Sequence, residues 1–99
     1  MVAEIYSAIE TVTGITKLQL QGRDKHLEVS RRRNMTCALL TMLGMSESSV
    51  GFELHRNRST VRTAKLVHKS ELEYDGRYAA EYAQILSKIS VKHVARDKV

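Results

Sequence analysis

Residues 46–64 read SESSVGFELHRNRSTVRTA, and this stretch decides the fold. Ser46 favours the start of a short helix, which is expected to end at the break over 55–57. Asn57 can then cap a second helix through its side-chain oxygen. The residues expected to face inward from the two helices are Val50, Leu54, Val61, Ala64 and His68 or Leu72. Two helices separated by a turn of three or four residues form a helix-turn-helix candidate.

The chain before this stretch shows the apolar spacing of amphipathic helices. One helix is expected over about 3–13, and a short helix or turn over 16–21. A longer helix is expected from Ser30 to Leu43, and its apolar face predicts that it forms the centre of the core. The residues expected to cap or close these helices are Gly14, Thr16 with Gln19, Ser30 and Gly44.

After the stretch, Asp75 or Gly76 is expected to open a C-terminal packing helix over about 76–95. Its core-facing residues are expected to be Tyr78, Tyr82, Ile85 and Ile89. No window shows convincing alternation with period two, which is the pattern of a half-buried strand. The sequence therefore predicts an all-α fold, a compact bundle of about five to six helices that includes the helix-turn-helix.

Length and composition limit what the chain can do. Its 99 residues, 42% of them hydrophobic, suffice for a single domain over 1–99 but not for a large enclosed active-site cavity. No set of nucleophile, base and orienting residue can be proposed, and no glycine-rich phosphate loop is present, so we do not expect an enzyme. The four His lie too far apart for a metal motif, and Cys37 stands alone and is expected in the core. No metal or other cofactor is expected.

The excess positive charge of the chain lies in two blocks. Residues 17–33 carry a net charge of +4 and residues 55–69 a net charge of +5, against +5 for the whole chain. Clustered bases of this kind are typical of proteins that bind a polyanion. A basic but merely solvated surface is the alternative, unless the fold brings the two blocks together.

The second basic block coincides with the second helix of the helix-turn-helix candidate. Arg58, Ser59 and Arg62 fall in its first turns, which are the positions that reach base edges when a recognition helix enters a major groove. Thr60 and the free backbone N–H groups of the first turn are suited to a phosphate oxygen. An ordinary capped surface helix rich in arginine would have the same spacing, so this alternative stays open.

Two separated motifs resemble the C-terminal DNA-binding domain of the bacterial replication initiator DnaA. The basic loop Arg23-Asp24-Lys25 leads into residues 31–35, RRRNM, where that family has an Arg-Pro-Arg-Gln-Met type of sequence. Val50-Gly51 and residues 56–64, RNRSTVRTA, resemble the family's Ile-Gly and its Arg-Asp-His-Ser/Thr-Thr-Val-x-x-Ala signature. The resemblance covers about residues 5–69.

The resemblance implies a Trp-repressor-like bundle whose basic loop enters a minor groove while the helix-turn-helix enters the adjacent major groove. Lys25 matches a residue that reaches the minor groove, and Arg33 matches a phosphate contact. His55 replaces a family glycine, and Asn57-Arg58 replaces Asp-His, which implies altered sequence preference because Asn suits adenine and Arg suits guanine. The expected DNA-binding residues are Arg23, Lys25, Arg31, Arg33, Arg56, Asn57, Arg58, Ser59, Thr60 and Arg62.

We therefore predict sequence-specific binding of double-stranded DNA by a standalone, DnaA C-terminal-domain-like protein without ATPase activity, regulating replication or transcription. Three of the tyrosines lie on one C-terminal segment rather than among the bases, which disfavours recognition of RNA or single strands by stacking. The alternative is a protein–protein interaction module that keeps the fold but not DNA binding. In either case a homodimer is conceivable through the C-terminal helix, where Val91 and Val94 face a second chain.

The location expected from the sequence is the bacterial cytoplasm, in association with the nucleoid. The longest uninterrupted apolar run, Cys37 to Leu40, is far shorter than the roughly 20 residues of a membrane-spanning helix. Glu4 and Glu10 precede the first basic residue, Lys17, which is the wrong charge order for an export signal. Neither a membrane nor a small-molecule substrate is expected as a partner.

Overall fold

Six α-helices form the part of the chain that the computed structural model describes, residues 1–89. No strand occurs within this part, so the predicted all-α class is confirmed. The helices are α1 (Val2–Thr13), α2 (Lys17–Gln21), α3 (Leu27–Met42), α4 (Glu47–Leu54), α5 (Arg58–Tyr74) and α6 (Gly76–Lys88).

Side-chain caps explain where most of these helices begin. Thr16 and Gln19 form the predicted capping box of α2. Ser46 and Asn57 cap α4 and α5 by accepting a hydrogen bond from the backbone N–H three residues later, and the carboxylate of Asp75 caps α6. The predicted starts of these four helices are therefore confirmed. They could be predicted because each cap depends only on residues close in sequence.

Two predicted helix boundaries are wrong. Helix α3 begins at Leu27, because the N–H of Ser30 already donates to the carbonyl of His26 and Ser30 therefore lies inside the first turn. Helix α6 ends at Lys88, because Ile89 is extended and its side chain is buried in the core, and residues 90–95 of the predicted helix lie outside the described residues. Val91 and Val94 lie outside the described residues.

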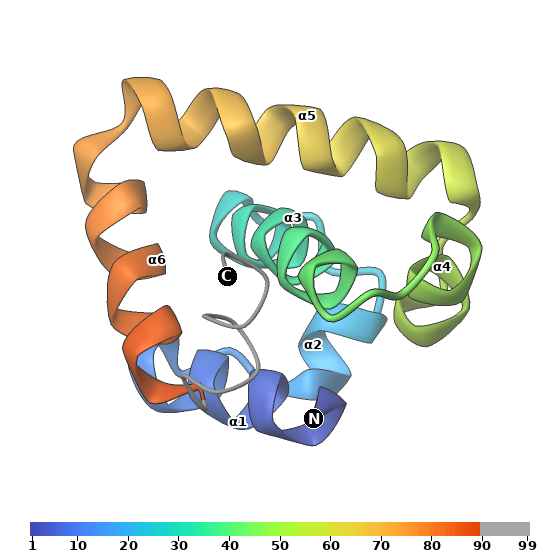
Figure 1. The fold of residues 1–99 in the computed structure, drawn as a ribbon, viewed down its shortest axis with the longest axis horizontal. Coiled ribbons are helices and arrows are strands. Elements are labelled where there is room, and N and C mark those ends of the chain that lie inside the picture. The colour runs from blue at the N-terminus through green and yellow to red at the C-terminus, as the bar shows by residue number, and fades with distance from the viewer. Residues whose placement is uncertain (90–99) are drawn as a thin grey trace.

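Helix α3 runs through the middle of the bundle, as predicted. In Figure 1 it is seen almost end-on, with α5 and α1 on opposite sides of it and α6 connecting them. It packs against α1, α2, α4 and α5, while α1 also packs against α6. The largest fully buried side chains come from all six helices: Ile5, Ile9, Leu20, Met35, Leu39, Leu40, Val50, Leu54, Val61 and Ile85.

Two side chains expected inside the bundle are found there. Cys37 is buried on α3, and burial raises the pKa of its thiol to about 11, so the thiol is protonated at neutral pH and serves in packing. His68 of α5 is buried beside α6, where its ring nitrogen Nδ1 lies 2.6 Å from the hydroxyl of Tyr78. Among residues 1–89, no helix is both long enough and apolar enough to cross a lipid bilayer.

Candidate nucleic-acid interface

Helices α4 and α5 are joined by a sharp connection of three residues, His55 to Asn57. The N–H of Arg56 donates to the carbonyl of Gly51 at 2.7 Å, which brings the connection back against α4. A Cβ atom on Gly51 would overlap the carbonyl oxygen of Arg56, so this close approach requires glycine. His55 closes α4 in the left-handed conformation, with φ 57°. The connection is therefore held in one shape by its own backbone.

The first turn of α5 presents an exposed set of donor groups. Arg58, Ser59 and Thr60 are all exposed, and Arg58 forms no ion pair with any residue of 1–89. The side-chain oxygen of Asn57 accepts two hydrogen bonds, each 2.8 Å long, from the N–H of Thr60 and the hydroxyl of Ser59. This oxygen has no lone pair left, so Asn57 offers only its N–H donors and does not suit the two-bond pairing with adenine expected above.

The basic loop between α2 and α3 lies next to this connection. Arg23 and Lys25 are exposed in the loop, and like Arg58 they form no ion pair with a described residue. The loop and the start of α5 line one open groove of about 640 Å³, whose walls are Gln21, Gly22, Arg23, Lys25, Arg33, His55, Arg56, Asn57 and Thr60. Residues from both basic blocks of the sequence therefore line the same groove.

Arg33 lies beneath the basic loop, with only 9% of its surface exposed. Its Nε donates to the carbonyl of Leu20 at 2.7 Å, and its Nη2 to the carbonyls of Gln19 at 3.2 Å, Gly22 at 3.4 Å and Asp24 at 3.1 Å. These bonds cap the C-terminal end of α2 and hold the loop, since carbonyl groups at a helix end favour a cation. The expectation that Arg33 is a surface phosphate contact is corrected accordingly.

Arg56 reaches the same loop from the other side. Its Nη2 donates to the carbonyl of Gly22, the carbonyl that also accepts from Arg33, and its Nη1 donates to the carbonyls of Leu54 and His55. Burial and the positive charge of Arg56 together lower the pKa of Arg33. The two guanidinium groups are thus close enough to repel each other, and backbone carbonyls compensate their charge.

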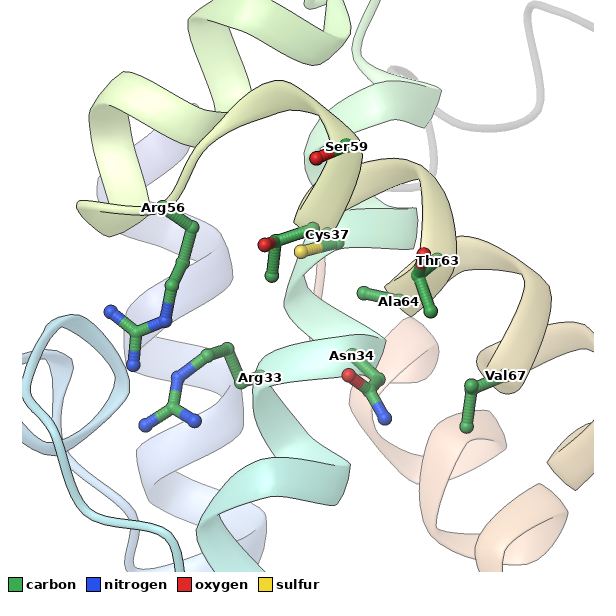
Figure 2. Close-up of a pocket in the computed structure, with 9 residues that line it drawn as sticks. Arg33, Asn34, Cys37, Arg56, Ser59, Thr63, Ala64 and Val67 are labelled. Atoms are coloured by element: carbon green, nitrogen blue, oxygen red, sulfur yellow. The ribbon is translucent and has the colours of Figure 1, made fainter.

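A second hollow lies between α3 and α5, directly beside the groove. It has a volume of about 300 Å³, and Figure 2 shows Arg33, Asn34 and Cys37 on its α3 side, Arg56 at one end, and Ser59, Thr63 and Val67 along α5. Asn34, Thr63 and Val67 were not among the predicted site residues. The spacing of Ser59, Thr63 and Val67 at intervals of four residues could have identified this face of α5.

The predicted contact Arg62 is already paired with an acid. Arg62 lies 3.0 Å from a carboxylate oxygen of Glu47, and the other oxygen of Glu47 lies 3.2 Å from the Nζ of Lys65. These two bases lower the pKa of Glu47, which keeps the carboxylate charged. The positive charge of Arg62 is therefore partly neutralised where it meets solvent.

Arg31 lies well away from the groove. Its guanidinium pairs with the carboxylates of Glu71 and Asp75, near the far end of α5. Glu71 follows the groove residue Thr60 by 11 residues, which is about 16 Å along the helix at 1.5 Å per residue. Arg32 pairs with Glu81 of α6 in the same region. These pairs join α3 to α5 and α6, so the guanidinium of Arg31, which was predicted to contact DNA, is already engaged by two carboxylates of the protein.

An acid and a histidine complete the basic loop. Asp24 accepts hydrogen bonds from the backbone N–H of His26 at 2.9 Å and from its ring Nδ1 at 2.6 Å. These bonds lower the pKa of Asp24, and the side-chain bond raises the pKa of His26. The loop therefore gains positive charge as the pH falls through the raised pKa of His26.

The geometry leaves three exposed and unpaired bases around the groove: Arg23, Lys25 and Arg58. The side-chain amide of Asn57 and the hydroxyl of Thr60, both on exposed residues, add hydrogen-bond donors at the helix start. Comparisons of the chain with protein-family models, with curated proteins and with solved structures found no match.

Proposed function

We propose that this protein binds double-stranded DNA through the groove between its basic loop and the start of α5. The observation that carries the proposal is that residues of the two basic blocks, which residues 34–54 separate in the sequence, line one groove, while Arg62 and Arg31 are paired with acids. A polyanion is the ligand that such a surface attracts. The motif resemblance to the DnaA C-terminal domain, with its Trp-repressor-like helix-turn-helix, supports duplex DNA in particular.

In this proposal α4 and α5 act as the helix-turn-helix. The first turn of α5 enters the major groove, where Arg58 pairs with a base edge, most readily that of guanine. The N–H groups of the turn that Asn57 does not cap, together with the hydroxyl of Thr60, hold a phosphate at the positive end of the helix dipole. Arg23 and Lys25 of the loop follow the adjacent minor groove.

The expected salt dependence follows from the free bases. Arg23, Lys25 and Arg58 neutralise about three phosphates, so the logarithm of affinity should fall against the logarithm of salt with a slope of about −3. The proposed biological role is regulatory, in replication or transcription at a bacterial nucleoid, and it rests on the motif resemblance alone.

One observation favours a different partner. Phe52 of α4 and Leu18 of α2 are 88% and 80% exposed, and apolar side chains of this size at a surface are typical of protein contacts. A protein-interaction module that uses these exposed side chains is the second candidate. Its affinity would depend weakly on salt, because apolar burial is not screened.

Fluorescence anisotropy tests the proposal directly. A labelled random-sequence duplex is titrated at two salt concentrations, with an unlabelled single strand as competitor. We expect salt-sensitive binding that the single strand displaces poorly. Absence of binding at low salt would refute the proposal and favour the protein partner.

Variants then separate base contacts from phosphate contacts. Arg58→Ala should lose about 1–3 kcal/mol on selected sites and relax specificity at one position, whereas Lys25→Ala should weaken all duplexes evenly. The control is Arg77→Ala, which removes an equal charge from an exposed position on α6. Equal losses from Arg58→Ala on every duplex would make Arg58 a phosphate contact.

A further inference from the structure

Arg56 belongs to the signature motif that is predicted to bind DNA, yet its guanidinium donates hydrogen bonds to backbone carbonyls of the protein itself. The Nη1 atom donates to the carbonyls of Leu54 at 3.1 Å, His55 at 3.2 Å and Gln21 at 3.5 Å. The Nη2 atom donates to the carbonyl of Gly22. Two of these acceptors lie in or beside the α4–α5 connection and two at the end of α2, so a single side chain joins the two segments.

The carbonyl of Gly22 is the point where this link meets a second one. Arg33 donates to the same oxygen and also to the carbonyl of Asp24, one residue before Lys25. The two guanidinium groups share this acceptor although they carry like charges, and burial together with the charge of Arg56 lowers the pKa of Arg33. The shared carbonyl keeps them side by side and fixes the loop between them.

We infer that Arg56 is a positioning residue that locks the basic loop to the α4–α5 connection, so that Lys25 and the start of α5 meet DNA as one rigid unit. This inference rests on the proposed function, because it concerns how the same groove is held. Arg56 acts through Lys25: without Arg56 the loop loses its tie to the connection, and the lysine no longer stands at a fixed distance from α5.

A double-mutant cycle on duplex binding tests this coupling. At about 0.15 M salt, Lys25→Gln alone should weaken binding about fivefold, the value of one phosphate contact. In the Arg56→Gln background the same change should weaken binding less than about twofold, because the loop is then no longer tied to the α4–α5 connection. The control pair is Arg56→Gln with Arg58→Ala, whose effects should multiply, since Arg58 makes no contact with the loop.

Arg56→Lys separates charge from geometry. Lysine keeps the positive charge but cannot reach carbonyls on both segments in the fixed fork of a guanidinium. We expect this variant to behave like Arg56→Gln in the cycle. Full affinity in Arg56→Lys together with independent effects of Arg56 and Lys25 would overturn the inference and make Arg56 a direct phosphate contact.

Amide hydrogen exchange gives a readout that needs no DNA. The N–H of His26, which is bonded to Asp24 in the loop, should exchange faster in Arg56→Gln, while amides in the centre of α3 keep their protection. Unchanged exchange at His26 would overturn the positioning role. If the wild-type protein binds no duplex but the loop loosens in the variant, the proposed function fails while the mechanical role of Arg56 stands.

Discussion

Replacing Glu47 with glutamine should strengthen DNA binding while it weakens the fold. The carboxylate of Glu47 holds both Arg62 and Lys65, at 3.0 Å and 3.2 Å, and it lies in the first turn of α4, where a negative charge is favourable. Glutamine keeps the size of the side chain but removes the charge. The two bases are then released toward DNA, and α4 loses an ion-pair network with α5.

The size of the binding effect follows from the number of bases released. Each base that neutralises one further phosphate steepens the log–log salt slope by about 0.9, so two released bases steepen it by at most about 1.8. At about 0.05 M salt, one added phosphate contact corresponds to roughly tenfold tighter binding. Arg62 is the more exposed of the two bases, and we expect the gain to come mainly from it.

Anisotropy titrations of Glu47→Gln over a range of salt concentrations measure both quantities, and thermal unfolding should show a lower midpoint. Glu10→Gln is the matched control, because it makes the same change in net charge on α1, which lies across α3 from α5 (Figure 1). An unchanged slope in Glu47→Gln, or equal gains in both variants, would refute the assignment of Arg62 to the DNA-facing surface.

Three further predictions concern stability. Gly51→Ala should lower the free energy of unfolding by about 1–3 kcal/mol in urea titrations, because its Cβ would overlap the carbonyl of Arg56; a neutral effect would contradict the described turn. His55→Gly should raise the free energy of unfolding by up to about 1 kcal/mol. The left-handed conformation costs a non-glycine residue about 1–2 kcal/mol, and the greater freedom of glycine in the unfolded chain cancels part of this gain. Burial lowers the pKa of His68 in the folded protein below the ordinary histidine value of 6.5. As the pH falls, His68 therefore takes up its proton in the unfolded chain before it does so in the folded protein. Stability should therefore be complete above that pH and fall below it, by at most about 1.4 kcal/mol per pH unit, and His68→Gln should flatten this part of the curve.

Much of the fold could be predicted because its decisive signals are local. Ser46, Asn57 and Asp75 act on backbone groups two or three residues away, and Gly14 adopts the predicted left-handed conformation, with φ 78°. The inward-facing residues follow from the helical period. The end of α6 was mispredicted because it depends on where Ile89 finds space in the core, which is a property of packing.

The roles of the arginines could not be predicted in the same way. Arg31, Arg33 and Arg56 have the same side chain, and in the sequence all three stand in basic motifs. In the fold, Arg31 pairs with the carboxylates of Glu71 and Asp75. Arg33 and Arg56 instead donate hydrogen bonds to backbone carbonyls. These partners lie 9 to 44 residues away in most cases, beyond the reach of any local pattern. The exposed bases, Lys25 among them, have guanidinium or ammonium groups that remain available for the role predicted from the motifs.

The packing of α1 against α6 has a consequence for how the chain matures. Ile5 and Ile9, near the start, and Ile85, near the end of the described residues, are all fully buried in one core. During synthesis on the ribosome, this core stays open until α6 has emerged, although the groove is complete in sequence once α5 has been made. A nascent chain that stalls before α6 therefore exposes apolar surface, and quality-control proteases should remove it before it competes for any ligand.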